Sequence, residues 1–306
     1  LTVIRDAEAA VQKKDPSFSI QKLDYDDAAT YKMLGQGETE GVFQLESSGM
    51  KQVLVGLQPQ NLEDVIALIS LYRPGPMDSI PTYLRNRHEP DKISYKTPQL
   101  AHILDVTNGC IVYQEQVMQI FRELAGFSFG QADNVRRAMS KKKHAVMEAE
   151  REHFVHGCTE PGHECPGCVA NGISEEVANE IYDEMSSFAS YAFNKSHAAC
   201  YAYVAFQTAY LKCHYPSEFM AALLTSVLDN TDKVIEYSGE CARLGLKVLP
   251  PDVNISNGGF TADNGKIRFG LNAVKNVGRN LIERVVEERQ EEPYSSLYDF
   301  CKRMHG

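Results

Sequence analysis

The sequence lacks any apolar run long enough to cross a bilayer, which takes about 18 residues or more. It also lacks a basic N-terminal stretch followed by an apolar segment. These absences argue against a membrane span and against a membrane anchor. We therefore expect a cytoplasmic protein without a membrane partner. Hydrophobic residues make up 43% of the 306 positions, so the chain can form one large domain and a smaller one.

Cysteine is also scarce, because eight thiols in 306 residues are too few for a disulfide framework. Three of them gather in the stretch HGCTEPGHECPGCVANG, which has the pattern C-x4-H-x-C-x2-C and two Pro-Gly turns. Its candidate zinc ligands are Cys158, His163, Cys165 and Cys168. Four protein ligands would make a structural zinc site, for which His153 and His156 are alternative fourth ligands. A loop of reduced, unligated thiols is the other interpretation.

Positive charge is in deficit overall, and a formal net charge of −10 argues against a protein whose whole surface binds nucleic acid. The stretch RRAMSKKK at 136–143 nevertheless contains five cations and no acid. We expect it on a helix over 131–155, where Arg137 and Lys141 lie four residues apart and Arg136 follows the adjacent stripe. Like charges so placed repel one another, which favours an anionic ligand there over a merely solvated face.

Two common signals for nucleotide or metal chemistry are missing. The glycine-rich stretch at 35–41 matches neither GxGxxG nor GxxxxGK[ST], and we interpret it as structural. Asp24 and Asp26 have a D-x-D spacing that suits a divalent cation, but no third carboxylate accompanies them. Asp26 or Asp27 precedes a helical run, so capping of that helix is the favoured role. No catalytic residue is assigned.

The longest helix is expected within 187–216, because the chain has neither Gly nor Pro from Asn194 to Tyr215. Helical spacing places two stripes on it. One stripe, available to something flat and polar, comprises Asn194, His197, Tyr201, Ala205, Thr208 and Lys212. The other, which would pack the helix down, comprises Tyr203, Phe206 and Tyr210. A buried helix with incidental polar residues is the alternative.

The rest of the chain predicts a mainly α protein that ends in a β-hairpin followed by a helix-hairpin-helix segment. Helical runs are expected at 62–71, 218–228 and 231–244, and the YRPGPM turn would fix Arg73 in place. After Pro250-Pro251, the dipeptide at 264–265 predicts a β-hairpin turn. Residues 271–286 have the layout of a helix-hairpin-helix, with a plain αα-hairpin as the alternative.

Five motifs occur in order along the chain: GETEGVFQLESSGM, LYRPGPM, YQEQVMQI, RRAMSKKK and SYAFNKSHAACYAYVAFQTAYLKCHYPSEFMAALL. Together they resemble the fingers region of the C-family replicative polymerases, the alpha subunits of bacterial DNA polymerase III. The resemblance implies three parts. They are a palm-to-fingers connection at 1–45, a helical fingers domain at 46–250 with a Cys-rich insertion at 158–168, and the start of a tandem helix-hairpin-helix domain at 251–306.

What the resemblance implies about function is template-directed DNA synthesis with two divalent metal ions, Mg²⁺, held by palm aspartates. No stretch here matches that aspartate signature, so this chain alone is expected to be inactive. The implied partners are primer-template DNA, deoxynucleoside triphosphates (dNTPs), the sliding clamp and other replisome subunits. A zinc-dependent protein-interaction module without nucleotide binding is the rival function.

The resemblance also assigns individual residues. The implied nucleotide-binding residues are Arg136, Arg137, Lys141, Asn194, Lys195, His197 and Tyr201. The three cations of this set would face the triphosphate, and the other four residues would lie against the nascent base pair. The implied DNA-binding residues are Arg73, Lys275 and Gly278. At the hairpin turn Asn276 stands where the motif usually has Gly, and Asn tolerates the left-handed conformation.

Overall fold

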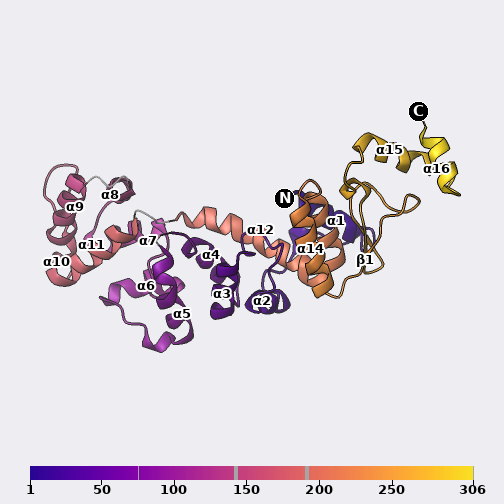
Figure 1. Cartoon of the computed structure of the whole chain (residues 1–306). Helices are drawn as coiled ribbons and strands as arrows, with labels where there is room; N and C mark the ends of the chain where they lie inside the picture. Colours follow the sequence, from indigo (N-terminus) through magenta and orange to yellow (C-terminus); the bar gives the residue numbers. More distant parts are fainter. Residues whose placement is uncertain (75, 141–143, 190–192, 306) are drawn as a thin grey trace. The chain divides into compact units, whose positions relative to one another are not determined.

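The computed structural model describes residues 1–74, 76–140, 144–189 and 193–305, and the chain folds as two compact units (Figure 1). The middle unit comprises residues 52–203, and the terminal unit comprises residues 1–51 and 204–306. The division falls within the long helix α12 (Lys195–His214). The fold is mainly α, as expected. Domain boundaries near 45 and 250 stay a prediction.

The middle unit is built from helices and short 3-10 turns. Its elements are α3 (Ser48–Leu57, which begins just before it), α4 (Leu62–Leu71), η2 (Pro76–Ser79), α5 (Ile80–His88), η3 (Pro90–Lys92), η4 (Pro98–Leu100), α6 (Ala101–Leu104), η5 (Asp105–Thr107), α7 (Gln114–Ala125), α8 (Phe129–Ser140), α9 (His144–His156), α10 (Gly167–Ala170) and α11 (Glu175–Ala189). Apolar residues recur at helical spacing on α7, and they meet three aromatic rings in the core. The rings of Phe121, Phe154 and Tyr182 lie 5.0 to 5.9 Å apart.

The prediction of a single helix over 131–155 was wrong. The structure has two helices there, α8 and α9, which pack against each other. Val135 and Met139 on α8 share one core with Phe154 and Val155 on α9. In one straight helix Met139 and Phe154 would lie about 22 Å apart at 1.5 Å per residue, so the packing of α8 against α9 is what brings them into the same core. Residues 141–143, including the predicted ligand Lys141, lie outside the described residues.

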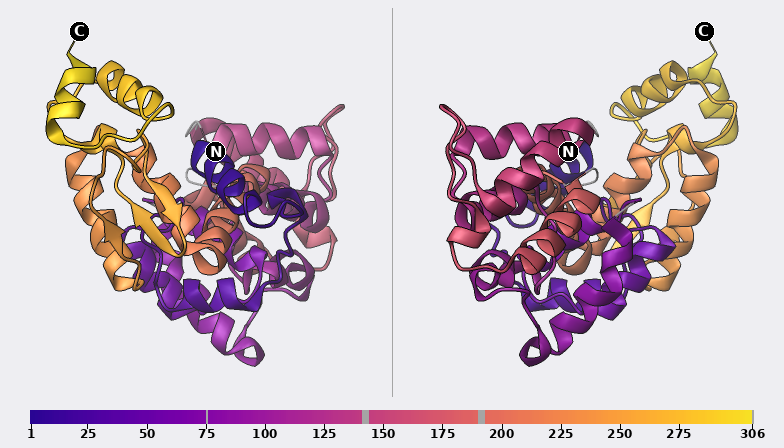
Figure 2. Two further views of the ribbon diagram at one scale, coloured as in Figure 1. Left: turned by 90° about the vertical axis from the view of Figure 1, so that its right-hand side faces the viewer. Right: turned by 90° about the vertical axis from the view of Figure 1, so that its left-hand side faces the viewer.

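The terminal unit combines helices with a small sheet (Figure 2). Its elements are α1 (Thr2–Gln12), η1 (Ile20–Lys22), α2 (Ala28–Gly35), α13 (Pro216–Ser226), α14 (Thr231–Arg243), β1 (Val248–Leu249), β2 (Thr261–Asp263), β3 (Lys266–Arg268), η6 (Leu271–Ala273), α15 (Arg279–Glu288) and α16 (Leu297–Met304). The strands lie in the order β1-β3-β2, with β1 parallel and β2 antiparallel to β3. The hairpin turn at 264–265 is confirmed, because both residues have positive φ. Asp27 caps α2 through Thr30, which confirms capping as a role in the DYDD stretch.

The helix-hairpin-helix segment differs from expectation in its first arm, which is only the 3-10 turn η6. Asn276 has φ 64°, so it adopts the left-handed conformation that the turn requires. α15 begins after Gly278, and its Ile282 and Val285 pack on Leu271. The segment therefore has a small core of its own.

The two stripes predicted for α12 are wrong along part of their length. Tyr203 is 44% exposed, although it was expected to pack the helix down. Conversely, Thr208 and Lys212 of the polar stripe are buried. The Lys212 ammonium donates hydrogen bonds to the Glu38 and Glu40 carbonyl oxygens, at 2.9 and 2.8 Å. Different elements pack against α12 at its different turns, so no single face of this helix is buried along its whole length. None of the helices in the described ranges has the length and apolar character that bilayer spanning demands.

Candidate nucleotide-binding site

The start of α12 is fastened to the start of α7. Tyr113 and Phe193 form a parallel β-bridge, and the Gln114 backbone N–H donates to the Phe193 carbonyl oxygen at 3.0 Å. The bridge places the first residues of both helices side by side. It thereby brings the FNKSHAACYA motif next to the YQEQVMQI motif, which are about 80 residues apart in the chain.

Glu115 adds a second fastening that the sequence did not predict. Its carboxylate accepts a hydrogen bond from the Asn194 side-chain amide at 2.7 Å and from the Lys195 backbone N–H at 3.1 and 3.2 Å. The Asn194 amide oxygen in turn accepts from the His197 N–H at 2.9 Å, which is an N-cap arrangement. An acid facing a helix N-terminus also suits the helix dipole. Asn194 is thus oriented from both ends of its amide group.

The rings of Phe193, His197 and Tyr201 form an aromatic ladder along the first turns of α12. The Arg73 guanidinium lies 3.8 Å from the centroid of the Phe193 ring. The His197 ring contacts Phe193 edge-on at 5.1 Å, and the Tyr201 ring at 4.5 Å. Burial lowers the pKa of Arg73, although the group stays cationic at neutral pH. Four predicted residues, Arg73, Asn194, His197 and Tyr201, are therefore neighbours.

Lys195 belongs to the same segment but is engaged elsewhere. Its ammonium forms a 2.9 Å ion pair with Glu63 and lies 5.3 Å from the centroid of the Tyr113 ring. These contacts hold α12 against α4 and the residue before α7. These contacts explain the position of the Lys195 side chain without a bound ligand.

The two described cations of the basic cluster share one carboxylate. Asp133 accepts hydrogen bonds from the Arg136 guanidinium at 2.7 and 3.0 Å, and it pairs with Arg137 at 2.7 Å. The Arg136 side chain also donates to the Gln114 amide oxygen at 3.0 Å. Hydrogen bonds from Arg136 hold the pKa of Asp133 below its usual value. The sequence reasoning missed Asp133, although its spacing of three and four residues from the arginines is a recognisable signal.

A pocket of about 490 Å³ lies between α7 and α8 and reaches the start of α12. Its lining residues are Gln114, Glu115, Met118, Gln119, Arg122, Glu123, Phe129, Asp133, Arg136 and Asn194. Arg136 and Asn194 thus border one cavity, although the sequence separates them by 58 positions (194 − 136). Arg137 is outside this lining, and its side chain is 65% exposed.

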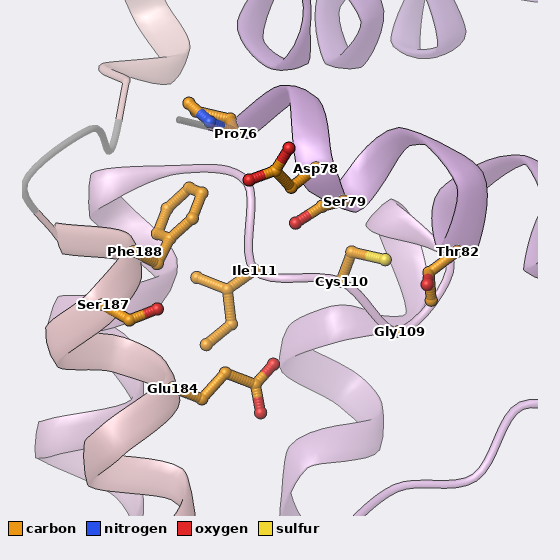
Figure 3. Close-up of a pocket in the computed structure, with 10 residues that line it drawn as sticks. All are labelled: Pro76, Asp78, Ser79, Thr82, Gly109, Cys110, Ile111, Glu184, Ser187 and Phe188. Atoms are coloured by element: carbon orange, nitrogen blue, oxygen red, sulfur yellow. The ribbon is translucent and has the colours of Figure 1, made fainter. Parts of the chain in front are cut away.

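A second pocket in the middle unit, of about 640 Å³, has a different character (Figure 3). Asp78 from η2 and Glu184 from α11 come from opposite walls, with the Ile111 side chain between them. Among its described lining residues there is no Lys or Arg, so it does not suit a triphosphate. Burial raises the pKa of its Cys110 thiol to about 11, which keeps the sulfur protonated near neutral pH.

The Cys-rich loop is a compact turn beside α9. Cys158 and Cys165 face each other in an antiparallel bridge, with both N–H···O distances 2.9 Å. Gly157 and Gly167 touch through their backbones, because a Cβ on Gly167 would lie 2.2 Å from the Gly157 nitrogen. His163 is exposed, and its ring centroid lies 6.5 Å from that of His153. Burial raises the pKa of the Cys168 thiol to about 12.

The predicted zinc ligands do not form a tetrahedral set in this conformation. Within the described ranges, one group of three acidic, Cys or His ligand atoms lies within 4.8 Å of one another, at Glu40, Glu46 and Glu236. Lys51 already pairs with Glu40, and Lys233 with Glu46 and Glu236. Zinc at the Cys-rich loop therefore stays a prediction.

The predicted DNA-binding residues of the hairpin lie at the entry to α15. Lys275 is exposed and forms no ion pair with any residue that the structure describes. Gly278 has ordinary negative φ, and a Cβ added to it would meet nothing within 4 Å. Nothing within the described chain requires glycine there. Arg73, the third predicted residue, lies in the middle unit with the aromatic ladder.

Two known families match parts of this chain. Residues 1–162 match the family described as bacterial DNA polymerase III alpha subunit finger domain. Residues 245–306 match the helix-hairpin-helix motif. The first match contains Arg73, Arg136 and the Cys-rich loop as far as Gly162, and the second contains Lys275 and Gly278.

Individual relatives extend the similarity over almost the whole chain. The DNA polymerase III subunit alpha of Thermus aquaticus is 48% identical over 311 residues, which cover 99% of this chain and 25% of the relative. The subunit of the same name in Bacillus subtilis is 43% identical over 305 residues, covering 99% of this chain and 26% of the relative. The chain spans about a quarter of the length of these relatives. It belongs to the finger-domain family of the bacterial DNA polymerase III alpha subunit.

Proposed function

We propose that this chain forms the fingers portion of a replicative DNA polymerase catalytic subunit and binds the incoming dNTP and the nascent base pair. The main support is the fastening of α12 to α7, which puts the aromatic ladder and the Arg136 guanidinium around Gln114. Family membership favours this function over a zinc-dependent interaction module. Because the chain is a fraction of its relatives, the activity of the whole polymerase is part of the proposal.

The two ends of this arrangement suit different parts of the ligand. Arg136 and Arg137, with Lys141, would bind the triphosphate through charge-assisted hydrogen bonds. The His197 and Tyr201 rings would lie against the nascent base pair, where the flat faces of bases favour stacking. The Asn194 amide, held by Glu115, would offer hydrogen bonds at a fixed orientation.

Chemistry at the primer end would need groups from outside this chain. Two Mg²⁺ ions held by palm carboxylates would activate the primer hydroxyl and neutralise the leaving pyrophosphate. This chain by itself is therefore expected to add no nucleotides. Primer-template DNA, the sliding clamp and other replisome subunits would be partners of the complete protein, which would work in the bacterial cytoplasm.

The hairpin at the end of the chain would contact duplex DNA. Lys275 offers an exposed cation, and the open space at Gly278 lets a phosphate approach the first backbone N–H groups of α15. Such contacts bind without regard to sequence and weaken as salt is added.

Tyr201 and Tyr203 provide a matched test of the nucleotide site, because they lie two residues apart on opposite sides of α12. Tyr201 joins the ladder through its contact with the His197 ring, whereas Tyr203 is 44% exposed. In the complete polymerase, Tyr201→Ala should raise KM for dNTP about tenfold, since base stacking on one ring is worth 1–3 kcal/mol. Tyr203→Ala should stay within about twofold of the parent. Equal effects in steady-state kinetics would exclude the ladder as the base-pair surface.

We also propose that the Cys-rich loop holds one structural zinc ion, supported by its ligand spacing and by the bridge between Cys158 and Cys165. The four ligands do not form a tetrahedral set in this conformation, so zinc binding would draw them together and fold the loop around the ion. Purified protein should contain one zinc per chain by metal analysis. Changing Cys165 and Cys168 together to Ser should remove the zinc and expose the loop to protease, because metal binding and local folding are coupled. Cys301→Ser, at an exposed position on α16, should retain it. A zinc content well below one per chain in the parent would exclude the site.

A further inference from the structure

The α7–α8 pocket extends well beyond Arg136 and Asn194. Its other end is formed by Arg122 near the end of α7 and by Phe129 at the first residue of α8. The two helices run antiparallel, so these residues meet at the far end of the same cavity.

Phe129 is unusual among the large apolar residues of the middle unit, because 65% of it is exposed. The Arg122 guanidinium lies 5.8 Å from the centroid of its ring. A ring so exposed contributes little to the core, but it offers an aromatic face at the edge of a cavity. Such a face beside an arginine is the arrangement on which unpaired nucleobases stack.

Three carboxylates and two guanidinium groups line the pocket, and other groups of the chain engage each carboxylate. Asp133 pairs with two arginines, Glu115 accepts from the start of α12, and Glu123 accepts from the Gln119 amide at 2.8 Å and pairs with His102. Arg122 forms no ion pair with any residue in the described ranges. One cation is therefore available for a backbone phosphate beside the ring of Phe129.

Resting on the proposed function, we infer that Phe129 and Arg122 form a site for an unpaired template base ahead of the nascent pair. The pocket begins at Asn194, where the nascent pair would lie, and it follows α7 from Glu115 to Glu123. These eight steps cover about 12 Å at 1.5 Å per residue. A stacked strand advances about 3.4 Å per nucleotide, so the third or fourth unpaired template nucleotide would reach Phe129.

The test uses the complete polymerase and two primer-template DNAs, with 5′ template overhangs of one nucleotide and of about six. Phe129→Ala should weaken binding of the long-overhang DNA about tenfold and leave the short-overhang DNA unchanged, because only the long one reaches the ring. Phe129→Trp should retain tight binding, whereas Phe129→Leu should not, because leucine has no aromatic face. With 2-aminopurine as the third or fourth overhang base, the parent should quench its fluorescence and Phe129→Ala should not.

Ile235→Ala serves as the matched control, since Ile235 on α14 is also 65% exposed. It should bind both DNAs as the parent does. Equal weakening of both DNAs by Phe129→Ala, or full binding by Phe129→Leu, would overturn the stacking site, as would unchanged binding. If Tyr201→Ala still raises KM for dNTP in that case, the proposed function stands and this inference alone fails. If neither change has an effect, both fail.

Discussion

A complete polymerase that carries Arg136→Ala and Arg137→Ala should show a KM for dNTP about 10- to 100-fold above that of the parent. Each charge-assisted hydrogen bond to a phosphate contributes roughly 1.5–3 kcal/mol, and 1.4 kcal/mol corresponds to a factor of ten. Both guanidiniums already pair with Asp133, so part of their positive charge is compensated before a ligand binds. Steady-state kinetics with varied dNTP measure the change.

Asp133→Asn supplies a control of opposite sign for the arginine variant. It preserves the size of the side chain but removes the negative charge that both guanidiniums share, so KM for dNTP should fall below that of the parent. A general disturbance of α8 would instead raise KM in both variants. If the double arginine variant retains the KM of the parent, the triphosphate does not bind at this cluster.

Lys212→Met should reduce the free energy of unfolding by about 3–5 kcal/mol, the cost of removing one partner from a buried ion pair. The Lys212 side chain is fully buried, and its ammonium lies 2.6 Å from the Glu240 carboxylate. Burial lowers the pKa of Lys212, yet three acceptors keep the ammonium bonded. Methionine fills a similar volume but leaves the carbonyl oxygens of Glu38 and Glu40 without this donor. Urea unfolding of the chain, followed by circular dichroism, measures the loss.

Lys233→Met is the matched control for the buried lysine. Lys233 also pairs with carboxylates, but its side chain is 35% exposed, so its removal should cost less than about 1 kcal/mol. Comparable losses for both lysine variants would contradict a special role of burial.

The Lys212–Glu240–Arg243 network also predicts that the chain is less stable in acid. Burial alone would raise the pKa of Glu240, but hydrogen bonds from Arg243 and Lys212 hold it below its ordinary value of 4.5. The contribution of Glu240 to stability is therefore present above pH 4.5 and is lost as the pH falls through the lowered pKa.

Local signals in the sequence were enough for much of the fold. The apolar run at 62–71 and the YRPGPM turn that follows it predicted α4, and Asn264-Gly265 predicted the hairpin turn. Both features depend on residues that are neighbours in the chain, which is why periodicity and turn chemistry find them. The β1 strand was not predicted, because its two residues form a strand only by pairing with β3.

The candidate site was predictable in its residue types but not in its connections. Helical spacing identified Asn194, His197 and Tyr201, and charge density identified Arg136. Glu115 escaped notice because its partners lie some 80 residues away, and only the folded chain brings them within hydrogen-bond distance. Tyr203 and Lys212 were misassigned for a related reason. A 3.6-residue period shows which residues share a face, but not which neighbour covers that face at each turn.

Gln114 has a consequence for engineering this protein. Its backbone N–H donates to the Phe193 carbonyl oxygen at the proposed base-pair end, and its side-chain oxygen accepts from Arg136 at the proposed triphosphate end. One residue would therefore set the distance between the two proposed recognition sites. A library that varies either end while keeping Gln114 preserves the spacing that a nucleotide needs, whereas an insertion beside it displaces both ends at once.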